Sequence, residues 1–232
     1  EFGFKVALDW SVGNGVAVIG IEGKNAEHDA TVTDPDFAAF FVNNFNKSEV
    51  ESLSYFGQWS TLANERWYFE AGVRVEEIAT ETDAVDAFPA RLVDMNPAMW
   101  PMGTPPRAVW MLRERFNAGD RSATDNNLDW VFKSRYQATD NLVIELGLAQ
   151  KTRSPLYQER YLWIPLEANA GIGDGNNYVG NPGLDPEESQ QIELGFDWNF
   201  VDYYFSPRIY HRKVDDYIQG VPATNMMVVA VS

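Results

Sequence analysis

Strict alternation of apolar and polar side chains is the main pattern of this chain, and it is clearest from residue 191 to residue 200. The apolar positions there are Ile192, Leu194, Phe196, Trp198 and Phe200. The positions between them are polar or small: Gln191, Glu193, Gly195, Asp197 and Asn199. A period of two predicts a β-strand with one apolar and one hydrated face. Such a strand suits a membrane barrel or a soluble sandwich, so this pattern alone leaves both open.

Seven further strands are predicted from the same alternation, at about residues 2–11, 16–22, 53–59, 67–76, 128–137, 142–151 and 205–218. Residues 12–15 contain an Asn-Gly pair, which is a strong signal for a tight turn. The register of the second strand is open, because two alternating sets could form its apolar face. One set is Ala17, Ile19 and Ile21, and the other is Val16 and Val18. In the last strand, Arg208, Arg212 and Lys213 break the alternation.

The predicted connections are alternately short and long, at about four, thirty, four, fifty, four, thirty-five and four residues. The polar residues 23–52 are expected to form one long loop. A second long loop is expected at residues 79–127, where so long a connection either folds locally or has a function. This asymmetry is typical of a transmembrane β-barrel, with short periplasmic turns at one rim and long extracellular loops at the other. A strand of about eleven residues, tilted near 45°, spans roughly the 25 Å apolar band of such barrels.

Composition agrees with this interpretation and excludes several classes of function. Aromatic residues make up 14% of the chain, as expected where aromatic girdles line two membrane interfaces. The formal net charge of −16 argues against a nucleic-acid partner, which needs a basic face. The chain has no cysteine, which excludes disulfides, thiolate catalysis and zinc sites with Cys ligands. No apolar run is long enough for a transmembrane helix.

Three short motifs resemble a known family. Residues 181–189 read N-P-G-L-D-P-E-E-S and residues 192–195 read I-E-L-G, which resembles the loop-to-strand signature N-P-x-L-x-P-E-x-S…E-L-G in the barrels of TonB-dependent outer-membrane receptors. Upstream, residues 151–155 are similar to the family's R-x-P exit from a strand into an extracellular loop. Downstream, residues 214–218 are similar to its x-D-Y/L-I strand end. The three motifs follow the family's order and cover about residues 127–218.

The resemblance implies an all-β fold: an antiparallel transmembrane β-barrel of 22 strands, of which this chain supplies about eight. It also implies a separate N-terminal plug in the lumen and uptake of a scarce nutrient, such as a siderophore-bound iron, cobalamin or an oligosaccharide, across the bacterial outer membrane with energy from the TonB complex. No cofactor is implied. The chain begins inside a predicted strand without a signal peptide, so residues 1–232 are expected to be a single partial barrel domain without the plug.

Aromatic residues in the predicted external loops are the candidate ligand contacts, since their rings can stack on a sugar or a siderophore. They are Trp100, Trp110, Tyr157, Tyr161, Trp163 and Tyr178. Packing between loops, or an interfacial girdle, is the alternative role for these rings. Charged residues predicted to face the lumen are expected to brace the wall or a plug: Arg74, Glu76, Lys133, Arg135 and Glu145.

Catalysis and metal binding find little support. Adjacent carboxylates such as Glu187 and Glu188 point to opposite faces of a strand, so they do not converge on one substrate. His28 and His211 lack the spacing of a zinc site. Residues 174–177 and 120–129 offer oxygen ligands for calcium, but turn formation explains their Asp, Asn and Gly content equally well. The alternatives to a receptor are a secreted carbohydrate-active β-rich enzyme or binding protein, and a passive porin without a plug.

Overall fold

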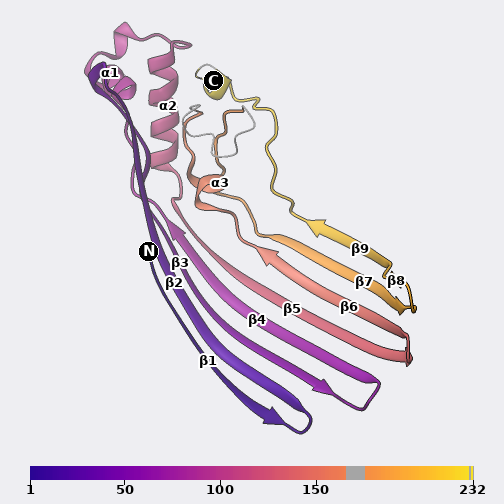
Figure 1. Ribbon diagram of the computed structural model, residues 1–232. Helices are drawn as coiled ribbons and strands as arrows, with labels where there is room; N and C mark the ends of the chain where they lie inside the picture. The colour runs from indigo at the N-terminus through magenta and orange to yellow at the C-terminus, as the bar shows by residue number, and fades with distance from the viewer. Residues whose placement is uncertain (166–175, 230, 232) are drawn as a thin grey trace.

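The computed structural model describes residues 1–165, 176–229 and 231, and its main feature is one antiparallel sheet (Figure 1). Its strands are β1 (Phe2–Val12), β2 (Gly15–Asp34), β3 (Phe37–Leu62), β4 (Trp67–Glu81), β5 (Ser122–Thr139), β6 (Leu142–Arg153), β7 (Glu187–Asn199), β8 (Tyr204–Phe205) and β9 (Arg208–Asp215). Each strand up to β8 pairs with the next in the chain, and β9 also pairs with β7. Within the described residues the sheet does not close. The prediction of an all-β, partial antiparallel barrel is therefore confirmed.

The register places apolar residues on one continuous face of the sheet. Leu8 pairs with Ile19, Ile19 with Gly57, Gly57 with Val73 and Val73 with Trp130. The set that includes Ile19 is therefore the apolar set of β2, which resolves the open register. We call this the outer face, and the opposite face, which is mostly polar, the inner face.

Large side chains on the outer face are exposed in the isolated chain: Leu8 is 65% exposed, Val73 50% and Ile192 48%. An apolar surface this extensive needs an apolar environment. On β4 the apolar band runs from Trp67 to Val75, which is about 23 Å for nine residues at ~3.3 Å each and a tilt near 40°. This matches the band of an outer-membrane barrel.

Aromatic rings gather on the outer face near the short-turn rim, and Trp67 stacks on Tyr136 with ring centroids 4.4 Å apart. Others close to that rim are Trp10, Trp59 and Trp198. Amphipathic rings are favoured at a membrane interface, so this row fits the predicted girdle.

Short turns lie at the lower rim in Figure 1, and all the helices lie at the upper end. The first turn has Gly13 and Asn14 at its centre, and Gly13 has a φ of 60° that a residue with a Cβ rarely adopts. The tight turn predicted at residues 12–15 is therefore confirmed.

Residues 23–52 are not a loop, and this prediction was wrong. They form the upper part of a long β2–β3 hairpin that turns at residues 35 and 36. Their Asp, Asn and Glu content reflects water on the outer side of strands that extend above the membrane. The ladder contains bulges, including register shifts between His28 and Ala30 and between Ala30 and Thr31. Lys47 of β3 lies opposite the first of these shifts and has a φ of 46°.

The irregular alternation of the last predicted strand also has a structural cause. Residues 206 and 207 interrupt it, because Pro207 lacks the N–H that a strand needs, and β8 and β9 are separate strands. Within β9, Arg208 pairs with Gly195 and Arg212 with Gln191, so both arginines lie on the inner face. Lys213 pairs with Gln190 above the apolar band on the outer face.

The connection between β4 and β5 folds locally, which is one of the two outcomes expected for this long connection. It contains α1 (Phe88–Met95), the 3-10 helix η1 (Pro97–Met99) and α2 (Pro105–Ala118). Together with the hairpin tip, residues 163–164 and α4 (Met226–Val229), these helices enclose a hydrophobic core: Val42, Val85, Ala87, Ala90, Val109, Leu112, Trp163, Ile164 and Val228. We call this body the cap. Among the described residues, no helix is long and apolar enough to cross a membrane.

Candidate functional site

The short helix α3 (Tyr157–Tyr161) lies against the inner face of the sheet, near its upper end. Its contacts are with Thr80 of β4, Asp125 of β5 and His28 of β2. The alternation of the strands places all three on the face that carries Glu22 and Arg74. Residues 157–163 of the β6–β7 connection therefore fold inward over β5, β4 and β3 instead of standing upright above their own strands.

Arg160 holds α3 in this position. Its guanidinium is bound in a bidentate manner by Asp125, with Nη1 2.9 Å from Oδ2 and Nη2 2.8 Å from Oδ1. Nη2 also donates to the Leu184 carbonyl at 2.9 Å and Nη1 to the Thr80 hydroxyl at 3.3 Å. The Arg160 side chain is 1% exposed and that of Asp125 6%. Paired charges with this geometry are the form in which an ion pair can be buried.

Tyr161 extends the same attachment. Its hydroxyl donates to the Thr80 carbonyl at 3.0 Å and lies 2.9 Å from the Thr80 hydroxyl. Burial raises the pKa of Tyr161, because its surroundings disfavour a phenolate. The ring packs with Phe45 and Leu162 in a second, smaller core. Tyr161 is 1% exposed, so packing occupies the whole of its surface.

Two more of the candidate aromatic residues, Tyr157 and Trp163, have packing roles. Tyr157 stacks on His28 with centroids 4.0 Å apart and packs edge-on against Phe45 at 4.9 Å. Trp163 is 2% exposed in the core of the cap, and its Nε1 donates to the Asn43 carbonyl at 2.7 Å.

The remaining three candidates are half-buried. Trp110 on α2 donates from Nε1 to Asp94 at 2.8 Å, and the guanidinium of Arg107 lies 4.4 Å from the centroid of its ring. Tyr178 packs against the smaller core beside Tyr157. Trp100 follows η1 and belongs to neither core. The structure thus gathers five of the six rings in and around the cap core and the smaller core, and contact of any of the six with a ligand stays a prediction.

A charged cluster joins the two longer helices of the cap. Arg113 of α2 donates to Asp86 at 2.8 Å and to Asp94 at 2.8 and 2.9 Å, and it pairs with Glu114 at 2.9 Å. Burial alone would raise the pKa of Asp86, but hydrogen bonds from Arg113 and Arg91 outweigh it and lower that pKa. The same acidic partners outweigh the effect of burial on Arg113 and raise its pKa.

A second cluster ties the start of α3 to the sheet. Arg153, the last residue of β6, donates to Glu187 of β7 at 2.8 Å and to Glu159 of α3 at 2.8 Å. The hydrogen bond from Arg153 holds the pKa of Glu187 below its usual range. Glu159 also accepts from the Leu156 N–H at 2.7 Å, which satisfies a free donor at the beginning of α3.

Charged side chains cover the inner face between the cap and the short-turn rim. Arg74 bridges Glu22 at 3.1 Å and Glu76 at 2.8 Å, while Arg208 bridges Glu145 at 3.1 Å and Asp197 at 2.8 Å. The Arg74–Glu22 and Arg208–Glu145 pairs each span one intervening strand, whereas Arg208–Asp197 joins neighbouring strands and Arg74–Glu76 lies within β4. Such pairs are expected to brace a wall that faces water.

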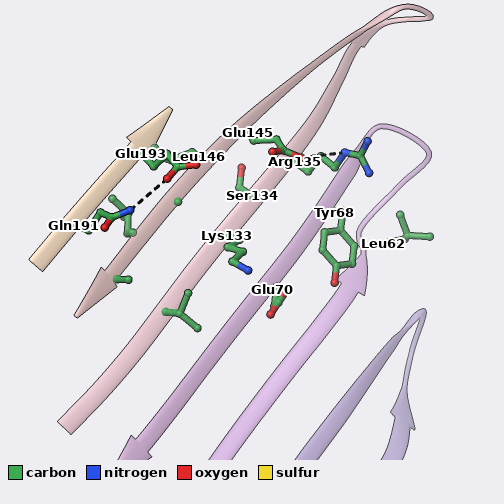
Figure 2. A pocket seen from close by; sticks show the side chains of 14 residues that line it. Leu62, Tyr68, Glu70, Lys133, Ser134, Arg135, Glu145, Leu146, Gln191 and Glu193 are labelled. Carbon is green, nitrogen blue, oxygen red and sulfur yellow. Dashed lines mark hydrogen bonds and ion pairs between the residues drawn. The ribbon is translucent and has the colours of Figure 1, made fainter. Parts of the chain in front are cut away.

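A hollow of about 580 Å³ lies on the inner face near the short-turn rim (Figure 2). Its lining includes Tyr68, Glu70, Lys133, Arg135 and Glu145. Apolar residues, among them Leu62, Val131 and Ala149, also line it, and it lies away from the aromatic loops.

Clustered metal ligands are absent from the described residues. Within the described parts of the chain, no group of three or more His, Asp or Glu side chains could hold a metal ion. The calcium candidate at residues 174–177 lies partly outside the described residues. Asp120 accepts from the Ser122 N–H and hydroxyl, both at 3.1 Å, which is the turn role that its sequence allows.

The residues that attach α3 were missed by the analysis of the sequence. Arg160 lies between aromatic residues, and Asp125 and Thr80 lie in segments predicted to be loop. A signal was present, because a lone arginine within an aromatic run needs a buried acidic partner. Its partner lies 35 residues away, and no local pattern identifies it.

Comparison with known proteins gives one family and several similar folds. A family model described as "TonB dependent receptor-like, beta-barrel" matches residues 1–230. Among curated proteins, none matches the chain.

Solved structures with a similar fold include three transport proteins. The copper transporter OprC has a TM-score of 0.62 at 17% identity, over 93% of this chain and 30% of that one. The ferric yersiniabactin uptake receptor FyuA from Yersinia pestis has a TM-score of 0.52 at 12% identity, over 93% and 28%. The siderophore receptor PiuA from Acinetobacter baumannii has a TM-score of 0.50 at 16% identity, over 90% and 31%. At these identities the likeness shows the fold alone, and this chain spans less than a third of each structure.

Proposed function

The chain belongs to the β-barrel family of TonB-dependent receptors, and from this premise we propose that the whole protein imports a scarce nutrient through the bacterial outer membrane. Barrels of this family lie in that membrane, and its members are receptors rather than enzymes. The alternative of a secreted carbohydrate-active enzyme is therefore set aside. Energy would come from the TonB complex, acting through a plug in the lumen.

The observation that carries this proposal is the inward fold of α3. A passive porin needs an open aqueous lumen. Here the β6–β7 connection lies against the inner face and is fixed there by the buried pair of Arg160 and Asp125, 2.8 Å apart. An element fixed inside the mouth narrows it, which suits a receptor that holds its cargo and admits it on demand.

Metal-carrying cargo is the class we favour. The three similar structures are described as a copper transporter, a ferric yersiniabactin receptor and a siderophore receptor, which supports a copper ion or a ferric siderophore over cobalamin or an oligosaccharide. The six candidate aromatics are proposed as cargo contacts. Trp100, Trp110 and Tyr178 retain exposed surface for this role, whereas Tyr161 and Trp163 would first have to be uncovered.

Growth of a host that lacks its own receptors tests the proposal. Cells that express the full-length protein should grow on a limiting ferric chelate or copper source only when TonB is functional. Growth that is equal without TonB would indicate a porin. The expressed protein should require detergent for extraction and migrate differently on a gel after heating. Loss of both properties would contradict the barrel itself.

A further inference from the structure

We propose that Met95, Met99 and Met102, at the end of α1 and around η1, form a binding site for a soft monovalent metal ion, namely Cu(I). The first observation is where the methionines lie. The chain has six, and none is in the nine strands of the sheet. All six lie in the cap: the three named above, with Met111, Met226 and Met227.

Exposure separates the proposed ligands from methionines that only fill a core. Met95 is 71% exposed, Met99 63% and Met102 69%. Methionine is apolar and normally fills irregular gaps in a core, as the half-buried Met227 does beside the cap core. Three exposed thioethers within eight residues bury little apolar surface, so packing within this chain does not explain them.

The chemistry of the thioether selects the metal. A methionine sulfur is a soft, neutral, polarisable ligand, and soft ligands of this kind favour Cu(I) over Mg²⁺, Ca²⁺ or Mn²⁺. Harder ions would need clustered His, Asp or Glu side chains, and the described parts of the chain contain no such group. The carboxylate adjacent in the sequence, Asp94, is already paired with Arg113 at 2.8 Å.

The three methionines lie within eight residues of the chain, and backbone hydrogen bonds turn the chain between them. Met95 ends α1, where the N–H of Asn96 bonds to the Leu92 carbonyl, and Met99 ends η1 with its own N–H on the Asn96 carbonyl at 3.2 Å. A further turn follows Met102, where the Thr104 N–H bonds to the Pro101 carbonyl at 3.2 Å. Successive tight turns hold this segment compact, and the long, flexible side chains can then converge on one ion.

A rigid support lies beneath the segment. Asp94 precedes Met95 and accepts hydrogen bonds from Arg113 and Trp110 of α2, all between 2.8 and 2.9 Å. Trp100 lies between Met99 and Met102 in the sequence and is half-buried. Metal sites bind more tightly when such supporting contacts fix the ligands.

This inference rests on the proposed function only for the side of the membrane that the site faces. The cap lies at the rim opposite the short turns, so in an outer-membrane receptor the site would open to the exterior. Binding itself does not require transport. The two proposals can therefore fail separately.

The test is a Cu(I) titration of the full-length receptor in detergent, under anaerobic reducing conditions, against a coloured Cu(I) chelator. The protein should withdraw Cu(I) from the chelator. The triple variant Met95→Leu, Met99→Leu, Met102→Leu should bind about tenfold more weakly or worse, since even supporting residues of a metal site contribute 10- to 100-fold. Leucine keeps a similar volume, so the fold should persist, which heat-dependent gel migration checks.

The control variant Met111→Leu, Met227→Leu removes two half-buried methionines and should bind Cu(I) as the parent does. X-ray absorption of the bound metal should show sulfur neighbours. Failure of the parent to compete with the chelator, equal affinity of the triple variant, or coordination by nitrogen and oxygen alone would each overturn the proposal. Cu(I) binding without uptake would leave this site standing and would count against the proposed function only.

Discussion

Replacing Asp125 with Asn should release α3 from the inner face of the sheet. The change keeps the size of the side chain but leaves the Arg160 guanidinium buried without a counter-charge. Because Arg160 is 1% exposed, water cannot compensate. Removing one partner of a buried ion pair costs about 3–5 kcal/mol. Thr80 and Leu184 still accept from Arg160, so we expect the lower end, about 3 kcal/mol.

A cost of 3 kcal/mol shifts the opening of α3 toward the released state by roughly 150-fold. Hydrogen exchange of the full-length receptor measures this directly. The N–H groups of Arg160 and Leu162 bond to the Leu156 and Gln158 carbonyls within α3, and both should exchange faster by that factor. The strand amides of β5 below Asp125 should keep their protection.

Asp129→Asn is the matched control. Asp129 lies on the same strand and face as Asp125, but its ion pair is with Lys151, whose side chain is 72% exposed. Exposed pairs contribute about 0–1 kcal/mol, so α3 should keep its protection. Unchanged exchange of α3 in Asp125→Asn would refute the reasoning. A double variant, Arg160→Met with Asp125→Asn, should recover part of the loss, because the buried charge is gone.

Three further predictions concern the attachment of the cap. Arg153 lowers the pKa of Glu187, so their pair stabilises the fold fully above the ordinary glutamate pKa of 4.5, and this stability is lost as the pH falls through the lowered pKa. Hydrogen exchange of residues 154–162 should accelerate in that pH range. In Glu187→Gln, the exchange rate should depend less on pH. Trp163→Phe should reduce the free energy of unfolding by about 1–3 kcal/mol in a thermal or denaturant melt, because the Asn43 carbonyl loses its donor; an unchanged melt would contradict this. Lys47→Gly should slow hydrogen exchange of the hairpin amides and Lys47→Val should speed it, because the left-handed φ of residue 47 strains a β-branched residue by about 1–2 kcal/mol. Equal exchange in both variants would show that the bulge is unstrained.

The sheet was predictable from the sequence because its environment imposes a period of two. Lipid outside and water inside force alternate residues to differ, as in the pairing of Ile144 with Phe196 and of Glu145 with Gly195. Above the membrane both faces of the β2–β3 hairpin meet water or the cap. The alternation of apolar and polar residues is weaker there, so the sequence of these strands predicted a loop.

The cap was not predictable in the same way, because its contacts join distant segments. Trp163 bonds to Asn43, which is 120 residues away, and Arg160 reaches β5. Aromatic content in a loop indicates either ligand contact or packing. Only three-dimensional structure shows that Tyr161 and Trp163 are already covered by protein atoms.

Two extra residues lie in β3 between Ser48 and Val42, one near Lys47 and one near Asn44. A single insertion reverses which side of a strand each later residue faces, and a second restores it. Deleting one of these two residues would turn Val42 away from the cap core and point the residue next to Val42 inward. Deleting both would keep Val42 facing inward but would straighten the hairpin beneath the cap. The cap could thus be detached from the barrel wall by changing chain length alone, without altering any residue that contacts lipid.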